Sequence, residues 1–260
     1  MKVSVITVTY NRELTISDTI ASVLSQNYSN IEYIIIDGKS TDKTVNIIKK
    51  YAINQSYKIK CISEKDTGIY DAMNKGIKMA SGDIIGILNS DDFFTSNNII
   101  SKIVDAFQKN PSIEAVYGDV HFVKHENLNK CIRYYSSKIF RRSLMRLGFM
   151  PAHPSFYMKR NSFEKYGLYK TNYKIAADFE FLLRVIFLYK ASTLYLPLDM
   201  VTMRDGGVST SGVNARKLIM KEHLRAFKEN RIYTNTIFLS LRYIYKITEI
   251  LLTKFKKNKK

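Results

Sequence analysis

Cysteine is scarce in this chain, and its placement argues against a cysteine-based metal site. The two cysteines, Cys61 and Cys131, lack the close spacing that zinc sites require. Cys61 lies in an apolar run, so we expect it to be a core residue of a protein from a reducing, cytoplasmic setting. No signal peptide is expected, because Met1-Lys2 leads directly into a strand pattern.

Glycine-rich phosphate-binding loops are absent as well. The first strand pattern, Val3–Thr9, is followed by Tyr10-Asn11-Arg12-Glu13 instead of the G-x-G-x-x-G turn of dinucleotide-binding folds. The complete Walker-type motif, G-x-x-x-x-G-K-[ST], is also missing from the sequence. Phosphate binding would therefore depend on side chains and a metal ion.

Acidic residues are few, and the resulting positive charge is local. The chain has 41 Lys and Arg residues against 23 Asp and Glu residues, a formal net charge of +18. Residues 214–260 hold 13 basic and three acidic side chains, and residues 124–146 hold seven and one. The rest of the chain is almost neutral. Basic patches beside apolar residues indicate contact with nucleic acid or an anionic membrane surface.

Strand and helix patterns alternate along the first hundred residues. Apolar runs predict strands at residues 3–9, 31–36, 57–63 and 84–88, with helices at residues 14–24, 42–53 and 70–80 between them. Short connections of this kind favour a parallel sheet with right-handed crossovers.

The second half of the chain has a less regular pattern. It predicts a strand at residues 115–123, an irregular basic segment up to residue 150, and helices at residues 176–188, 214–229 and 236–254. No repeat or low-complexity linker divides the chain.

The apolar run that begins at Ile84 ends on two adjacent carboxylates, Asp91 and Asp92. In open α/β sheets, ligands bind outside the carboxyl ends of the strands. Two neighbouring acids repel each other unless a cation or a proton intervenes, so we expect a divalent metal, Mn²⁺ or Mg²⁺, at this pair. The alternative is a solvated turn before the next helix.

Three more acids, Asp37, Asp66 and Asp178, are expected on the same rim, because each follows a strand or opens a helix. Asp37 could instead cap the next helix, although Asp42 is better placed for that role. Asp66 could equally form a surface ion pair with a neighbouring lysine.

Several ordered motifs resemble family 2 glycosyltransferases of the GT-A fold over about residues 1–210. They are Ser4–Asn11, Asp37–Asp42 and Asn89–Asp92, and Glu64–Gly76 is similar to the donor-side segment of bacterial members that build polysaccharides, including the colanic-acid type. The resemblance implies an inverting transfer of a sugar from a nucleotide diphospho-sugar to an acceptor hydroxyl.

The resemblance also implies an organisation. We expect an α/β, Rossmann-like mixed sheet flanked by helices, with amphipathic helices at the C-terminus. Residues 1–212 would form the GT-A domain, with a nucleotide-sugar-binding half (1–110) and an acceptor-binding half (111–212). Residues 213–260 would form a basic helical tail.

Residue roles follow from the resemblance. Asp91 aligns with the last acid of the D-x-D motif and is the predicted metal ligand, assisted by Asp92. Asn89 stands where the first acid is usual, and Gly38 replaces another frequent Asp. The predicted donor-binding residues are Thr9, Tyr10, Asn11, Asp37, Asp66, Asn89, Asp91 and Arg204.

Asp178 opens a helix after the acceptor region and is the predicted general base. Glu180 is expected on a solvated helix face. His153 resembles the histidine that lines the acceptor pocket in the family, although a structural role is equally open. Arg204 precedes a glycine-containing loop, which could close over the diphosphate.

The segment 236–260 is amphipathic and ends in a lysine cluster. Its charge-free stretches are too short to cross a membrane, which predicts an in-plane helix on an anionic leaflet. This placement suits a lipid-linked saccharide acceptor and a protein at the cytoplasmic, inner face of a cell membrane. Packing on the core or in a homodimer is the alternative.

Two other classes of protein would fit part of this pattern. A metal-dependent nucleotidyltransferase also combines an α/β sheet with a carboxylate-bound metal, but its glycine-rich loop after the first strand is missing. A nucleic-acid-binding module would account for the basic charge and leave the acids at four element ends unexplained. We therefore expect no nucleic-acid partner.

Overall fold

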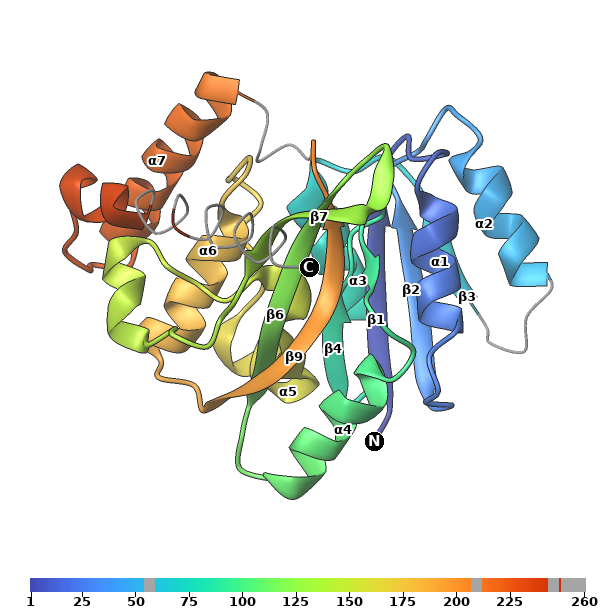
Figure 1. Ribbon diagram of the computed structural model, residues 1–260, viewed down its shortest axis with the longest axis horizontal. Helices are drawn as coiled ribbons and strands as arrows, with labels where there is room; N and C mark the ends of the chain where they lie inside the picture. The colour runs from blue at the N-terminus through green and yellow to red at the C-terminus, as the bar shows by residue number, and fades with distance from the viewer. Residues whose placement is uncertain (54–58, 207–211, 243–247, 249–260) are drawn as a thin grey trace.

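The computed structural model describes all residues except 54–58, 207–211, 243–247 and 249–260, and it shows a central sheet with helices on both faces (Figure 1). The strands are β1 (Val3–Thr9), β2 (Ile31–Asp37), β3 (Ile59–Ser63), β4 (Ile84–Ile87), β5 (Phe93–Phe94), β6 (Ala115–Lys124), β7 (Asn127–Tyr135), β8 (Tyr157–Lys159) and β9 (Thr193–Arg204). The helices are α1 (Ile16–Leu24), α2 (Thr44–Ile53), α3 (Ile69–Met79), α4 (Ile99–Lys109), α5 (Arg160–Tyr166), α6 (Ala177–Leu182) and α7 (Gly212–Glu229). Short turns η1 (Arg142–Leu147) and η2 (His153–Ser155) and a π-helical segment η3 (Leu183–Leu188) complete the list.

The sheet is mixed, as predicted. Its strand order is β3-β2-β1-β4-β8-β6-β9-β5, and β7 pairs with β6. The first four of these strands are parallel, while β8 runs antiparallel to both β4 and β6. The carboxyl ends of β1, β2 and β4 therefore lie at one edge of the sheet, where the predicted acids begin.

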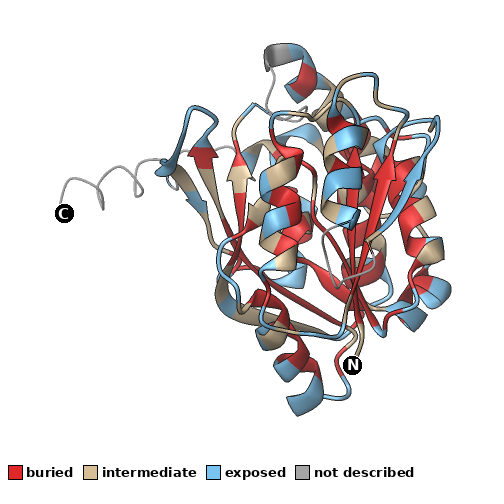
Figure 2. Ribbon diagram, turned by 90° about the vertical axis from the view of Figure 1, so that its right-hand side faces the viewer, coloured by how far each residue is buried: buried red, intermediate tan, exposed pale blue. Residues whose placement is uncertain are grey.

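Apolar side chains cover both faces of the sheet. Helices α1, α2 and α4 pack on one face, and α3, α5, α6 and α7 contribute to the core on the other. Alternation along β1 sends Val5 into the first core and Ile6 into the second. Because both faces are covered, the central strands are almost continuously apolar and buried (Figure 2).

Two expectations from the sequence are wrong. The basic segment after residue 124 is not irregular, since it forms β7 and η1. β7 is largely exposed and so carries no apolar alternation that would reveal it. Cys61 is exposed and not a core residue, because β3 is an outer strand of the sheet.

The C-terminal part of the described chain packs on the rest of the molecule. The His223 ring of α7 stacks on Phe179 of α6, with the ring centroids 3.8 Å apart. Residues 236–242 are helical, and most of the predicted helix 236–254 lies outside the described residues. Among the helices that the structure describes, none has the length and apolar character needed to span a membrane.

Candidate active site

A pocket of about 420 Å³ opens at the carboxyl ends of β1 and β4. Nine of the residues singled out from the sequence line it: Thr9, Tyr10, Asp66, Asn89, Asp91, Asp92, His153, Asp178 and Arg204. Asn11 lines an adjoining cavity of about 350 Å³, which shares Arg12, Asp91 and Arg204 with the first. Most of the predicted site residues therefore lie around these two adjoining cavities, although they come from distant parts of the chain.

A row of polar contacts crosses the pocket from the Asn89 side to Asp178. The Asn89 Nδ2 atom lies 3.2 Å from Nε2 of His153, and His153 Nδ1 lies 3.3 Å from Asp178 Oδ2. Because Asn89 Nδ2 is a donor, Nε2 of His153 is the acceptor, which assigns the ring proton to Nδ1 beside the carboxylate. The Tyr70 hydroxyl lies 3.2 Å from Asp178 Oδ1 and shares its single proton between this oxygen and the Ile175 carbonyl, which is 2.5 Å away. Both oxygens of Asp178 are thus held in place and keep lone pairs for a further proton donor.

Asp91 and Asp92 differ in their environments. Asp91 is partly exposed in the pocket, whereas Asp92 is buried beside it and lies 3.4 Å from Asn89 Nδ2. Burial, followed by the charge of Asp91, raises the pKa of Asp92 well above its usual range. A cation at this place would offset the repulsion between the two carboxylates.

The residues around Asp91 fit a metal ion that shares its coordination with a bound donor. The Asn89 Oδ1 atom is buried and has no hydrogen-bond partner within the described chain. In the part of the chain that the structure describes, no cluster of three or more His, Cys, Asp or Glu side chains could hold a metal. Mg²⁺-type ions often bind through one or two carboxylates plus substrate phosphates, which matches this incomplete set.

The first strand ends on three predicted donor-binding residues with different surroundings. Thr9 Oγ1 is buried without a partner in the described structure, while Tyr10 is exposed at the pocket. Asn11 has a positive φ of 52° and accepts a hydrogen bond from the Thr41 amide at 2.9 Å. The tight turn at Asn11 thereby ties the end of β1 to the loop after β2.

The loop after β2 is built around Asp37. Its carboxylate is fully buried and accepts hydrogen bonds from the Ser40 amide at 3.0 Å, the Ser40 hydroxyl, and the Ser63 hydroxyl at 2.6 Å. In this conformation Asp37 supports the loop and does not line the pocket. Asp42 caps α2 as expected, because its Oδ1 accepts the Thr44 amide at 2.9 Å.

Gly38 leaves room for Asp66. A Cβ atom at position 38 would come within 2.5 Å of Asp66 Oδ2, so a side chain there would displace this carboxylate. Asp66 also accepts the Gly68 amide at 3.0 Å and lines the pocket. The carboxylate of Asp66 can therefore occupy this position only because residue 38 has no side chain.

Arg204 is the last residue of β9 and is not part of a free loop. Its guanidinium group donates to the Asp91 carbonyl at 2.7 Å and forms an ion pair with Asp18 of α1. The side chain is buried yet lines both cavities. Arg204 thus fixes the backbone of Asp91, and most of the following loop (residues 207–211) lies outside the described residues.

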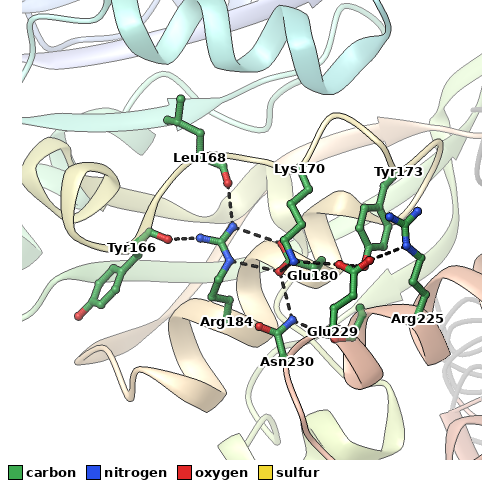
Figure 3. A network of polar contacts seen from close by, with 10 residues as sticks. Tyr166, Leu168, Lys170, Tyr173, Glu180, Arg184, Arg225, Glu229 and Asn230 are labelled. Carbon is green, nitrogen blue, oxygen red and sulfur yellow. Dashed lines mark hydrogen bonds and ion pairs between the residues drawn. The ribbon is translucent and has the colours of Figure 1, made fainter.

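Glu180 contradicts the expectation of a solvated helix face. Its side chain has 0% exposure and binds Lys170 Nζ at 3.0 Å and Arg184 Nε at 3.2 Å (Figure 3). Asn230 adds a hydrogen bond of 3.1 Å. Glu180 does point away from Asp178, but the opposite side of α6 is covered by the 166–173 segment and α7.

The sequence pattern missed two residues that hold Asp178, the predicted base, and the backbone before it. Tyr70 lies at the start of α3, and burial followed by the charge of Asp178 raises the pKa of its hydroxyl well above the usual value. Glu222 of α7 accepts three backbone amides just before α6. Tyr70 lies inside the segment Glu64–Gly76 on which the family resemblance rests. The sequence around Glu222, in contrast, contains no motif that would mark its role.

Taken together, the mixed sheet and the carboxylates at the end of β4 define a glycosyltransferase of the GT-A class. The chain belongs to glycosyl transferase family 2, whose sequence profile matches residues 4–167. Members of this family are inverting glycosyltransferases. This membership decides against a nucleotidyltransferase or a nucleic-acid-binding module.

Known relatives agree with this family. A "PGL/p-HBAD biosynthesis glycosyltransferase" of Mycobacterium tuberculosis is 25% identical over 213 residues, covering 81% of this chain and 80% of the relative. A second protein of the same organism, an "uncharacterized glycosyltransferase", is 32% identical over 193 residues, covering 74% and 71%.

Solved structures establish the likeness of the fold. Staphylococcus aureus TarS 1–349 in complex with UDP-GlcNAc has a TM-score of 0.65 at 18% identity, over 87% of this chain and 66% of that one. Pyrobaculum calidifontis mannosyltransferase PcManGT, in complex with GDP-Man and Mn²⁺, has a TM-score of 0.63 at 20% identity, over 91% and 66%. The chain thus spans just under two thirds of either solved chain.

Proposed function

We propose that this protein transfers a sugar from a nucleotide diphospho-sugar, bound at Asp91, to an acceptor hydroxyl activated by Asp178. The observation that carries the proposal is the row of polar contacts Asn89–His153–Asp178. It joins the donor side of the pocket to the predicted base through a residue predicted to face the acceptor. Residues 1–110 would supply the donor half and residues 111–212 the acceptor half.

Asp178 acts as the general base in this proposal. Its carboxylate takes the proton of the acceptor hydroxyl while the oxygen attacks the anomeric carbon and the bond to the diphosphate breaks on the opposite side, which inverts the configuration. His153 and Tyr70 orient the two carboxylate oxygens. A positioned base of this kind contributes about 10²–10⁴-fold to the rate.

The proposed donor side combines Asp91 and Asn89 with Asp66, Thr9, Tyr10 and Arg204. Two of its buried atoms, Asn89 Oδ1 and Thr9 Oγ1, have no hydrogen-bond partner among the described residues, which supports contact with a ligand. Mn²⁺ or Mg²⁺ held by Asp91 and Asn89, beside Asp92, would neutralise charge on the diphosphate leaving group. Asn11 and Asp37 would shape the nucleotide end through the loops that they hold.

The proposed acceptor is a lipid-linked saccharide, as in polysaccharide synthesis of the colanic-acid type, reached from the cytoplasmic face of a membrane. Support comes from the start of the C-terminal segment, where Ile237 is 75% exposed and Tyr233, Phe238 and Leu241 are also exposed. The Thr234 hydroxyl donates a hydrogen bond to the Arg146 carbonyl at 2.9 Å. This apolar surface therefore lies beside the exposed arginines of η1. Apolar and basic side chains together favour an anionic leaflet.

A thermal-shift panel tests the donor site. UDP-, GDP- and dTDP-sugars, including UDP-GlcNAc and GDP-mannose, are each added with Mn²⁺, Mg²⁺ or EDTA. A donor at a hundredfold excess over its Kd stabilises the protein by about 2.7 kcal/mol, roughly 5–10 °C in a chain of this size. We expect one nucleotide family to give this shift only with metal, and the Asp91→Ala variant to lose it.

The matched control is Asp105→Ala, which removes an exposed carboxylate of α4 away from the pocket and should keep the full shift. A shift that ignores both EDTA and the Asp91 substitution would contradict the metal-bound donor site. The absence of a shift with every donor would overturn the proposed function itself.

A further inference from the structure

We infer that Glu222 is a positioning residue that fixes the backbone carrying Asp178; the inference rests on the proposed function of Asp178 as the base. Glu222 belongs to α7, in the part of the chain predicted to be a separate tail. Its carboxylate is buried, with Oε1 accepting the Lys174 amide at 2.7 Å. Oε2 accepts the amides of Ile175 at 3.0 Å and Ala176 at 2.9 Å.

The Ala176 amide is in a buried hydrogen bond and needs an external acceptor, and the amides of Lys174 and Ile175 beside it are in partly buried ones. They precede α6, and Ala176 at the helix start has no side chain that could accept their hydrogen bonds. A buried amide without a partner is unfavourable, so the segment would otherwise adopt another path. Glu222 supplies the acceptor from a position 46 to 48 residues further along the chain.

The same segment is also held by α3. The Tyr70 hydroxyl donates to the Ile175 carbonyl at 2.5 Å and lies 3.2 Å from Asp178 Oδ1. Residues Lys174, Ile175 and Asp178 all line the 420 Å³ pocket. Glu222 and Tyr70 thus both hold one pocket wall, and this wall presents the base to the acceptor.

A carboxylate suits this position better than its neutral isostere. An ionised Glu only accepts hydrogen bonds, whereas a Gln amide group also donates and would direct an N–H toward at least one of the three backbone amides. Misplacing a reacting group by about 1 Å can cost a hundredfold in rate. The Glu222→Gln variant should therefore weaken catalysis without touching the donor residues.

The test compares Glu222→Gln with the wild-type full chain in three measurements. Amide hydrogen exchange over residues 174–176 reports the hydrogen bonds directly. Thermal shifts with UDP-GlcNAc and GDP-mannose report donor binding, and nucleoside diphosphate release from the donor that binds, with water as acceptor, reports the reaction. We expect exchange to accelerate and release to slow by about tenfold or more, with the donor-induced shift retained.

Glu229→Gln on the same helix is the matched control, because the partners of Glu229 within the described chain are side chains: Lys170, Tyr173 and Arg225. It should leave exchange at residues 174–176 and release unchanged. If Glu222→Gln does not fold, Glu222→Asp keeps the charge but shortens the side chain, and should show the same changes to a smaller degree.

Unchanged exchange or unchanged release in the folded Glu222 variants would overturn the inference. Asp178→Asn separates this failure from that of the proposed function. Loss of release in Asp178→Asn, with wild-type release in the Glu222 variants, would overturn the positioning role alone. Wild-type release in Asp178→Asn would overturn the assignment of the base, and the inference with it.

Discussion

Glu180 shows how much a single buried charge constrains this molecule. Its carboxylate is fully enclosed and contacts two cations, Lys170 and Arg184, while Arg184 also donates to the carbonyls of Tyr166 and Leu168. The network ties α6 to the preceding segment, immediately beyond the start of α6 where Asp178 lies. Enclosed carboxylates are tolerated only with such partners, because desolvation of the charge is costly.

We expect Glu180→Gln to lower the free energy of unfolding by about 3 kcal/mol, since Arg184 loses its carboxylate partner and Lys170 loses one of its two. Urea unfolding curves measure the change. Glu164→Gln is the matched control, because Glu164 is 74% exposed and 3.8 Å from its partner Arg160, so it should change stability by less than about 0.5 kcal/mol. Similar midpoints for the two variants would contradict the role given to Glu180.

The residues of the site were predictable to the extent that strand ends and family motifs mark them. Asn89, Asp91 and Asp178 stand at such positions, and the structure places all three at one pocket. The expectation for Glu180 was wrong because helical periodicity shows only which way its side chain points relative to Asp178. It does not show which other segments of the chain cover that side of the helix. Glu222 was out of reach, since its role depends on a contact across 46 to 48 residues.

At the scale of elements, α7 and α6 form one packed unit. The His223 ring is stacked on Phe179 and contacts Arg242, with Nδ1 of the ring 2.7 Å from Nη1. Burial, followed by the positive charge of Arg242, lowers the pKa of His223 well below its ordinary value of 6.5. Helices with a regular apolar pattern, such as these two, were predictable from the sequence. β7 was missed because an exposed strand lacks apolar alternation.

The His223 environment predicts a loss of stability in mild acid. Below about pH 6.5 the unfolded chain binds a proton at this histidine and the folded chain does not, so the free energy of unfolding falls as the pH decreases. Between pH 7.5 and pH 5.5 the loss from this group is about 1.4 kcal/mol. We expect His223→Phe, which keeps a ring against Phe179, to remove this part of the pH dependence in urea unfolding. Equal slopes for both proteins would contradict a neutral buried His223.

At the scale of the whole molecule, the basic charge and the exposed apolar residues converge near the C-terminal segment. In the described part, Leu239 is buried and Arg242 faces His223, so the helix at residues 236–242 directs its inner side to the protein. Ile237 and Leu241 lie on its outer side and are exposed. An apolar surface that covered this outer side would remove these two side chains from water. The adjoining arginines favour an anionic surface for this contact.

We therefore expect the protein to sediment with vesicles that contain phosphatidylglycerol, less with purely zwitterionic vesicles, and less as the salt concentration rises. The double variant Ile237→Ser/Leu241→Ser should bind the anionic vesicles at least about tenfold more weakly, because each apolar side chain transferred from water contributes roughly 1.5–3 kcal/mol when fully buried. Ile53→Ser, at an exposed isoleucine of α2 in the other half of the chain, should bind like the wild type. If the double variant kept full vesicle binding, another surface would hold the membrane. If the wild type ignored vesicles but formed a dimer that the double variant lost, the outer side of the helix would be a subunit contact, and the proposal of membrane docking would be wrong.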